Sequence, residues 1–537
     1  MAKLRKIKKR LRTVKKVKPE PVDLDISELK SALEKARKIL DEDEYYKISL
    51  ALDTLGFLGH ELDKKKVSIQ RLKQMLFGET TEKTDNVFKE EKEPPEGNDD
   101  KELKKPKKPT KGHGRNGVDS YAGAEKTKVR HPELKAGDSC PDCKKGTIYQ
   151  HKSSQLIRIS GQAPLQARVY ELEKLRCNLC GKTFTAPAPE GVGKDKYDAE
   201  SASMMALLKY GSGIPFNRLE RLQGNLGIPL PKSTQWDIVH GVSEIMDPVY
   251  RQMIQQAAQG KVLHNDDTTM KILKLEQKKE NRSGVFTSGI VSVLEEGQRI
   301  ALFFTGQKHA GENLIDLMRQ RDEHLDKPIQ MCDALSRNMP EGLRTIMGNC
   351  NAHGRRRFVE VSKSFPQECL YVLEIFKEVY HYDDLTKKMT DQERLAYHQE
   401  NSGPKMAELY TWLNEQFDQH KVEPNSSLGN AIGYMLNHWE KLTLFLRQPG
   451  APLDNNICER ALKKAILHRK NAYFYKTENG ARVGDLYMSL IYTCELNQVN
   501  PFDYLTALQK NKDSITAEPE KWLPWSYQET LKASNMA

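Results

Sequence analysis

The sequence of 537 residues has no apolar run that approaches the roughly 20 residues needed to span a bilayer. Its basic N-terminus lacks the apolar segment of a secretory signal. Nine cysteines are too few to suggest a disulfide framework in a chain of this length. These absences argue against a membrane or secreted protein and predict a cytoplasmic location, in a cell without a nucleus.

Acidic residues are absent from the first stretch of the chain, where ten Lys or Arg lie between Lys3 and Lys18. A second basic run occupies residues 101–115, and the net charge of the whole chain is +11. Blocks of like charge are usually solvated arms, and basic ones often bind nucleic acid. We therefore predict a disordered basic arm over residues 1–25 and a polyanionic partner such as DNA.

A hydrophobic residue recurs every seven positions in the next part of the chain, at Ile48, Leu55, Leu62, Ile69 and Leu76. Heptad spacing with charged residues between predicts a coiled coil, formed either as a dimer or as an intramolecular hairpin. We assign this helical coiled-coil region to residues 26–78. Residues 79–136, rich in Lys, Glu, Pro and Gly, are predicted to be a disordered linker.

Two Cys-x-x-Cys pairs follow the linker, Cys140 with Cys143 and Cys177 with Cys180. Four thiolates in two tight turns can enclose one tetrahedral Zn²⁺ ion. Because protein ligands would fill all four positions, the ion would be structural and not catalytic. A redox-active pair is the alternative, although it would not require two copies. The predicted zinc-binding domain covers residues 137–190.

Residues 191–256 are predicted to be mainly helical. The stretch FNRLERLQGNLGIPLPKSTQWDIVHGVSEI indicates a helix, a turn at GNLGIPL and a second helix that begins near Pro231 and Ser233. Either a DNA-binding helix-turn-helix or an ordinary helical hairpin fits this pattern. In the first case the start of the second helix would face DNA with Lys232, Ser233, Thr234 and Gln235.

From residue 261 the hydrophobic period changes from that of helices to that of strands. Three strand-like runs, KVLHNDDTTMKIL, SGVFTSGIVSVLEEG and RIALFFTG, precede a helix at GENLIDLMRQ. Two further strands follow, in IQMCDALS and RTIMGNCNAHGRRRF. This is the order of a ribonuclease-H-like α/β fold, in which the first and fourth strands lie side by side. We predict the first part of such a core over residues 257–358.

Three acids are candidates for a catalytic metal site. Asp266 lies inside the first strand, where a buried charge is costly unless it binds a metal or a partner. Asp333 ends the fourth strand, where ligand sites of open α/β sheets occur. Glu459 follows Asp454, a possible N-cap that would place Glu459 in the second turn of a helix. Three carboxylates can hold two Mg²⁺ ions about 4 Å apart for phosphoryl transfer.

Two alternatives stay open for these acids. Asp267 competes with Asp266, because alternation along a strand lets only one of them face the metals. Each acid, taken alone, is also compatible with an ordinary surface position.

Several segments, taken in their order along the chain, carry a resemblance to a known family: RLKQMLFGETTEK, the CPDC and CNLC pairs with TAPAPEG, KYGSGIPFNRLERLQ, HNDDTTMKIL, QMCDALSRN, NAHGRRRF and LDNNICERALKKAILHRKNAYFYKTENGARV. The chain resembles the transposases of the insertion sequence 66 family, bacterial DDE transposases, along nearly its whole length. The resemblance implies a leucine-zipper-like region, a zinc-binding domain, a helix-turn-helix segment and a ribonuclease-H-like catalytic core.

The resemblance also assigns roles to individual residues. It implies that Asp266, Asp333 and Glu459 bind two Mg²⁺ or Mn²⁺ ions. The family's first motif usually reads Asp-Glu-Thr, whereas Asp267 stands second here, and the loop ALSRN after Asp333 departs from the family's Gly- and Tyr-containing turn. A helical insertion over residues 359–450, a final helical part of the core over 451–510 and a C-terminal segment over 511–537 complete the predicted organisation.

Basic residues flank two of the acids in sequence. Arg355, Arg356 and Arg357, with His353, follow the last strand, and Lys463, Lys464, Arg469 and Lys470 follow Glu459. Arg presents forked donors that suit phosphate, and Lys presents a point charge, so we expect these residues to hold DNA. Solvated helix faces are the alternative for each of them.

The predicted function is that of a DNA transposase, an Mg²⁺-dependent polynucleotidyl transferase. It would bind the terminal inverted repeats of a mobile element, cleave them and join them to target DNA. The expected partners are DNA, further copies of the chain and accessory proteins of the same element, and the protein would be nucleoid-associated when bound to DNA. The alternative is a transposase-derived DNA-binding protein without catalytic activity.

Overall fold

The computed structural model describes residues 26–37, 41–42, 44–50, 52, 135–139, 141, 144, 147, 163–176, 183–190, 195–275, 282, 284–340 and 342–536. The predicted basic arm, most of the heptad pattern, most of the linker and the four cysteines of the Cys-x-x-Cys pairs lie outside these residues. The chain divides into two compact units, one of residues 1–90, 187–221 and 230–537 and the other of residues 91–186 and 222–229. Near the start, helix α2 covers Ile26–Ala36.

The smaller unit contains two short antiparallel pairings. Strand β1 (Lys174–Arg176) pairs with β2 (Thr183–Thr185), and an isolated bridge joins Ser139 to Thr147. In sequence, each Cys-x-x-Cys pair lies between the two partners of one pairing. The described residues are therefore compatible with two turns that each present one cysteine pair, and the zinc site stays a prediction.

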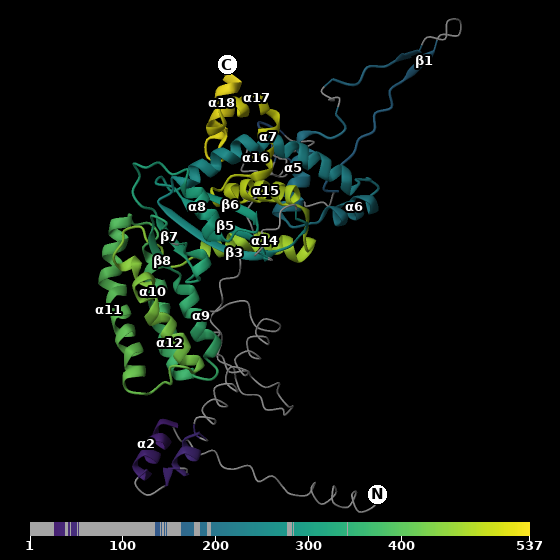
Figure 1. Cartoon of the computed structure of the whole chain (residues 1–537). Coiled ribbons are helices and arrows are strands. Elements are labelled where there is room, and N and C mark those ends of the chain that lie inside the picture. The colour runs from purple at the N-terminus through teal and green to yellow at the C-terminus, as the bar shows by residue number, and fades with distance from the viewer. Residues whose placement is uncertain are drawn as a thin grey trace, which may run out of the picture. The chain divides into compact units, whose positions relative to one another are not determined.

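The larger unit is built on a five-stranded mixed sheet in the order β6-β5-β3-β7-β8 (Figure 1). Its strands are β3 (Val262–Met270), β5 (Val285–Val293), β6 (Arg299–Gly306), β7 (Ile329–Cys332) and β8 (Ile346–Asn349). Strands β3, β5 and β6 pair antiparallel, whereas β7 and β8 run parallel to β3. The prediction that the first and fourth strands of this region lie side by side is confirmed.

Helices cover both faces of this sheet, which explains why its central strands are buried on both sides. Helix α14 (Asn456–Ala472) packs on the face that carries Gly289, where an added Cβ would come within 3.0 Å of Leu462. The missing side chain at Gly289 thus lets α14 approach the strand closely. Helices α7 (Lys232–Ala258) and α8 (Ala310–Met318) cover the opposite face.

Between β8 and α14 the regular elements of the described chain are all helical. They are α9 (Asn351–Val361), α10 (Pro366–Leu385), α11 (Asp391–Asp418), α12 (Ser427–Asn437), α13 (Trp439–Leu442) and the 3₁₀ turn Leu444–Leu446. These helices share a hydrophobic core, with Phe358, Phe376, Leu409 and Met435 among its buried members. The same core includes Val262 of β3 and Ile329 of β7, so the helices pack continuously onto one end of the sheet.

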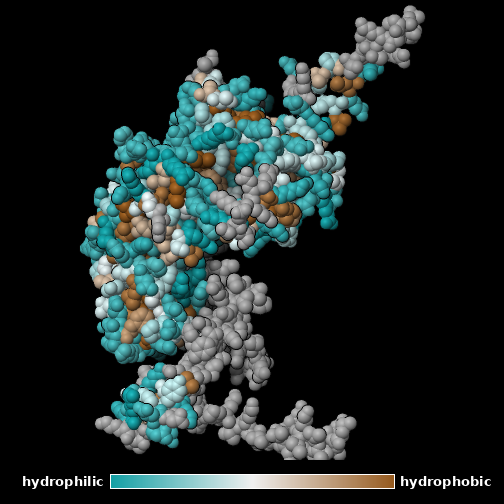
Figure 2. Space-filling view, in the orientation of Figure 1, coloured by the Kyte–Doolittle hydropathy of each residue, from teal (hydrophilic) through white to brown (hydrophobic). Residues whose placement is uncertain are grey.

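Further helices of the larger unit are α5 (Ala199–Ala206), the π-helical turn Leu207–Gly211, α15 (Glu478–Leu496), α16 (Pro501–Lys510), α17 (Lys512–Ala517) and α18 (Tyr527–Met536). Helix α6 (Phe216–Asn225) begins in the larger unit, and its residues from 222 on are assigned to the smaller one. A parallel pair of three-residue strands, β4 (Ile272–Lys274) and β9 (Tyr475–Thr477), was not predicted. No helix within the described ranges is both long enough and apolar enough to cross a membrane. Hydrophilic residues predominate on the face of the larger unit seen in Figure 2.

Helix α15 closes the free edge of strand β6 through polar side chains. The backbone N–H groups of Arg299, Ala301, Phe303 and Thr305 donate to the side chains of Asn497, Thr493, Ser489 and Asp485, respectively. Four helical residues rise about 6 Å and two strand residues about 6.8 Å, so the two periods stay in step over this length. This side-chain ladder satisfies strand donors that would otherwise remain unpaired.

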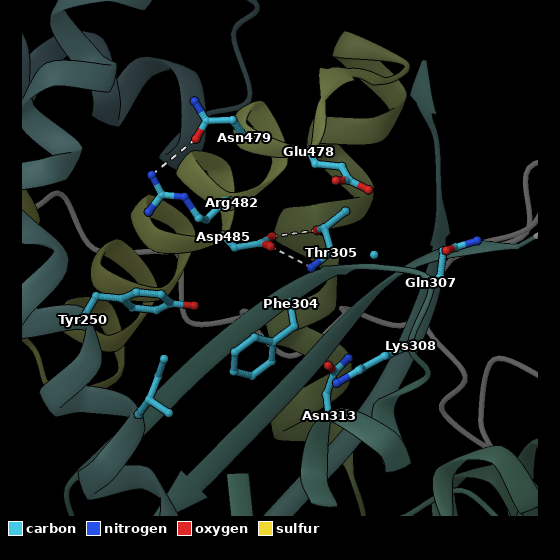
Figure 3. Close-up of a pocket in the computed structure, with 12 residues that line it drawn as sticks. Tyr250, Phe304, Thr305, Gln307, Lys308, Asn313, Glu478, Asn479, Arg482 and Asp485 are labelled. Carbon is cyan, nitrogen blue, oxygen red and sulfur yellow. Dashed lines mark hydrogen bonds between the residues drawn. The ribbon is translucent and has the colours of Figure 1, made fainter. Parts of the chain in front are cut away.

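Asp485 provides a test of the ladder. Its carboxylate accepts bonds from the N–H and the hydroxyl of Thr305, both at 2.6 Å (Figure 3), and burial raises its pKa to about 7 from 3.8. At pH values between these two pKa values, Asp485 is protonated in the folded chain but ionised in the unfolded chain. The free energy of unfolding should therefore fall as the pH rises from about 4 to about 7.

Asp485→Asn, neutral at every pH, should remove this part of the slope. Since one pKa unit corresponds to about 1.4 kcal/mol, the variant should gain up to a few kcal/mol relative to wild type across the window. Urea denaturation at several pH values measures this difference. The exposed Asp513, changed to Asn, is the control, and parallel curves for wild type and Asp485→Asn would contradict the assignment.

Candidate active site

The parallel pairing of β3 with β7 determines where the two predicted aspartates lie. Val262 is opposite Ile329, and His264 is opposite Met331. The same offset, continued to the end of β7, places Asp333 level with Asp266. Both acids therefore lie near the carboxyl end of β7, on neighbouring strands at the centre of the sheet.

Asn338 holds these two carboxylates together. Its side-chain Nδ2 donates to Asp333 Oδ1 at 2.7 Å and to Asp266 Oδ1 at 3.2 Å. Asn338 is fully buried, and its backbone carbonyl accepts bonds from Asn265 and Gln330. One amide thus links the two acids and is itself fixed to both strands. Asn338 lies in the segment ALSRN, which departs from the family pattern, and sequence reasoning did not identify it.

The carboxyl group of Asp266 is buried close to other acidic side chains. Burial raises its pKa to about 7, and the charges of Asp333, Asp267 and Glu459 add to the increase, while the N–H of Asp267 opposes it. Asp333 is buried beside it. Buried carboxylates that repel one another in this way favour the binding of a cation between them.

Asp267 points to the other side of the strand and has partners of its own. Its carboxylate lies 2.8 Å from His309 Nδ1 and 3.2 Å from Arg337 Nη2, and its side chain is 1% exposed. The alternation of side chains along β3 accounts for this separation. Of the two neighbouring acids, it is Asp266 that faces Asp333.

Buried amides position helix α14, which carries Glu459. Asn455 donates to the carbonyl of Asn265 at 3.1 Å, and its Oδ1 lies 3.0 Å from His264 Nδ1. The expected N-cap at Asp454 is wrong by one residue: Asn455 is the N-cap, and Asp454 accepts the N–H of Asn456. The helix therefore begins later, and Glu459 lies in its first turn instead of its second.

The carboxylate of Glu459 has neighbours different from those of the aspartates. Glu459 Oε1 lies 3.6 Å from His353 Nδ1, and Oε2 lies 3.5 Å from Arg356 Nη2. Within the described residues, the group whose metal-ligating atoms all lie within 4.8 Å of one another is Cys350, His353 and Glu459. Glu459 is close enough to raise the pKa of Asp266, but the three predicted acids do not form such a group.

Comparison with known proteins adds an independent observation. The family model described as "Transposase IS66 family" matches residues 196–483, more than half of the chain. The chain belongs to the IS66 transposase family.

Curated relatives come from Sinorhizobium fredii (strain NBRC 101917 / NGR234). The chain is 24% identical to the uncharacterized protein y4hP over 399 residues, which cover 70% of this chain and 71% of that protein. It is 31% identical to the uncharacterized protein y4jD over 182 residues, covering 33% of this chain and 35% of that protein. Their names state no activity, so the functional argument rests on the family and on the site.

The basic residues of this IS66-family chain divide into two groups. Arg469 donates to Thr268 and Thr269 of β3, Lys464 pairs with Glu495, and Arg357 lies over the Tyr434 ring. These contacts hold the helices in place. In contrast, Lys463 and Lys470 are exposed. Arg355 is half-buried and, like the first group, has an interaction within the protein.

The helix–loop–helix segment also separates into exposed and buried positions. Lys232 and Ser233 are exposed at the start of α7, and Thr234 is half-buried. Gln235 is fully buried, and its side chain donates to the carbonyls of Phe216 and Leu230. The expectation that Gln235 faces DNA therefore does not hold in this conformation, because its side chain joins the two helices.

A separate cavity of about 610 Å³ lies between β6, α7 and α15 (Figure 3). Its lining includes Tyr250, Lys308, Arg482 and Asp485, and Arg482 donates to Asn479 at its rim. None of the three predicted acids lines this cavity. The candidate active site is thus an arrangement of carboxylates and amides at the sheet, separate from this hollow.

We predict that Asn338→Ala weakens divalent-metal binding by about tenfold, because residues that orient metal ligands typically contribute 10–100-fold to affinity. Titration calorimetry with Mn²⁺ measures the effect. Asn401→Ala, which removes an amide bonded to Tyr397 within helix α11, is the matched control. An unchanged Mn²⁺ affinity in Asn338→Ala would contradict the prediction that Asn338 orients the two aspartates.

Proposed function

We propose that this chain is a DNA transposase that binds the ends of an insertion sequence and catalyses Mg²⁺-dependent strand cleavage and transfer. The observation that carries the proposal is the placement of Asp266 beside Asp333 on neighbouring parallel strands of a chain that belongs to a transposase family. Glu459 lies on α14, which packs against β3 and β5 of the same sheet.

The sheet order supports a ribonuclease-H-like core for this activity. Three antiparallel strands precede two strands that run parallel to the first, and the helices α9 to α13 intervene before α14. On this proposal the helices between β8 and α14 are an insertion into the core. The insertion then accounts for the long stretch of sequence between the two aspartates and Glu459, the third acid of the proposed site.

The donor set fits hard divalent cations. Asp266 and Asp333 offer carboxylate oxygens, the ligands that Mg²⁺ and Mn²⁺ prefer, in a buried site with excess negative charge. When bound there, two such ions would activate the attacking oxygen and stabilise the leaving oxygen during displacement at phosphorus. Asn338 would keep the aspartates oriented, and Glu459 would complete the set.

DNA would be held by the basic residues whose side chains are exposed to solvent. Lys463 and Lys470 are exposed on the helix that carries Glu459, and Lys232 and Ser233 are exposed at the start of α7. Point charges at these positions suit phosphate groups. We propose that α6 and the start of α7 act as a helix-turn-helix, and that further copies of the chain and accessory proteins complete the active complex.

The four cysteines Cys140, Cys143, Cys177 and Cys180 are proposed to bind one structural Zn²⁺ ion. Metal analysis of the purified chains should then find one equivalent of zinc fewer in Cys177→Ser than in wild type. Full zinc retention in that variant would contradict the site.

An inactive, DNA-binding derivative is the second candidate. It is favoured by the position of Glu459, whose carboxylate faces His353 and Arg356 and forms no common ligand group with the aspartates. Activity with DNA therefore has to decide between the two.

We expect Asp333→Asn and Glu459→Gln each to lower Mg²⁺-dependent cleavage and joining of element-end DNA by at least about a hundredfold. Such a metal ligand contributes several kcal/mol to the transition state, and each 1.4 kcal/mol is tenfold in rate. DNA binding, measured by gel shift, should stay within about twofold. Glu400→Gln, on the exposed side of α11, is the control.

Wild-type activity in the variants would show that these acids are not the metal ligands. A wild-type chain that binds ends but never cuts them in Mg²⁺ or Mn²⁺ would support the DNA-binding derivative instead.

A further inference from the structure

The first turns of two helices meet at Glu459. Cys350 directly precedes α9 and is fully buried, and His353 lies in the first turn of that helix. Glu459 lies in the first turn of α14. The ligand atoms of these three residues all lie within 4.8 Å of one another. The backbone N–H of Asn455 donates to Cys350 Sγ at 3.2 Å, so the thiol also connects the two helix starts.

Two polar atoms in this group face each other without a hydrogen bond. His353 Nδ1 and Glu459 Oε1 are both buried, and neither has a hydrogen-bond partner among the described residues. Their separation of 3.6 Å is too long for a hydrogen bond. Buried polar atoms normally have a partner, so this pair needs an explanation.

The separation suits two ligands of one metal ion. In a tetrahedral zinc site with ligand bonds of about 2.1 Å, neighbouring ligand atoms lie roughly 3.5 Å apart. A thiolate, an imidazole and a carboxylate form a mixed set that favours Zn²⁺, whereas Mg²⁺ prefers oxygen ligands alone. The two anionic ligands would balance the charge of the ion. Burial raises the pKa of the Cys350 thiol to about 12, so binding of the ion would have to displace the thiol proton.

We propose that Cys350, His353 and Glu459 bind one Zn²⁺ ion, and that this ion inhibits the enzyme by withdrawing Glu459 from the Mg²⁺ site. The inhibitory part rests on the proposed function, whereas the binding part does not. Three protein ligands leave the fourth position open to water, which is compatible with half-buried His353 and Glu459. Arg356, 3.5 Å from Glu459 Oε2, holds the other carboxylate oxygen, so Oε1 is directed toward His353.

Cobalt provides a direct test of the binding site, because Co²⁺ replaces Zn²⁺ and gives a charge-transfer band with a thiolate ligand. The metal-free full-length chain is first given one equivalent of Zn²⁺, which the predicted site of four thiolates should take in preference to a site of three mixed ligands, and is then titrated with Co²⁺. Wild type should develop the band, and Cys350→Ala should not. His353→Ala should bind Co²⁺ at least about tenfold more weakly.

The controls separate binding from unfolding. Cys369→Ala removes another fully buried thiol, within α10, and should leave the cobalt band unchanged. Circular dichroism checks the fold of each variant, and the half-buried His353 provides a milder substitution if Cys350→Ala does not fold. Equal cobalt spectra and affinities in wild type, Cys350→Ala and His353→Ala would overturn the site.

The inhibitory part is tested with Zn²⁺ added to DNA cleavage in excess Mg²⁺. Each chain is compared with itself, with and without Zn²⁺, so that any change in basal rate cancels. Cleavage by wild type should fall at least about tenfold, and cleavage by His353→Ala less than about twofold. Equal inhibition of both would overturn the regulatory part. A chain that binds Co²⁺ through Cys350 but cleaves nothing without Zn²⁺ would instead refute the proposed function and support the binding site alone.

Discussion

The parallel pairing of β3 with β7 is the constraint on which the site depends. Its register brings Asp333, which lies 67 positions after Asp266, level with that residue. Two carboxylates placed side by side in a buried position repel each other, and that repulsion contributes to the raised pKa of Asp266. The helices above and below the sheet restrict solvent at this point, so the carboxylates need partners supplied by the protein or by a cation.

The protein supplies neutral amides as these partners. Asn265, Gln330, Asn338 and Asn455 are fully buried and form one connected set of hydrogen bonds. The set joins β3, β7, the 3₁₀ turn Ser336–Asn338 and the start of α14. Amides can orient carboxylates without neutralising them, whereas Asp267 forms an ion pair with Arg337 and lies within hydrogen-bond distance of His309. This difference preserves the negative charge of Asp266 and Asp333 for a cation.

The sequence predicted the sheet well because its strands carry strong hydrophobic patterns and end in recognisable turns. The proximity of Asp266 and Asp333 could be predicted from their positions in the first and fourth strands. The predicted start of α14 was one residue early, because Asp454 binds the N–H of Asn456 from a turn before the helix, while Asn455 occupies the N-cap position. Asn338 could not be found, since its role depends on a loop conformation that leaves no periodic signal.

Other differences have similar physical causes. The polar amide of Gln235 could contact DNA, but in the folded chain it donates hydrogen bonds to the carbonyls of Phe216 and Leu230. The pairing of β4 with β9 joins three-residue strands about 200 positions apart in sequence, too short to show alternation. Most of the heptad region, most of the linker and all four zinc ligands lie outside the described residues, so the coiled coil, the linker and the zinc site stay predictions.

The side-chain ladder between β6 and α15 has a consequence for how copies of this chain can assemble. An open strand edge can recruit a strand from a neighbouring molecule and extend the sheet across the interface. Here the outward-facing N–H groups of β6 already donate to Asn497, Thr493, Ser489 and Asp485, so a foreign strand would have to displace a whole helix. Contacts between copies of this chain would then have to use surfaces other than the β6 edge, and the sheet could not be extended by a second copy on that side.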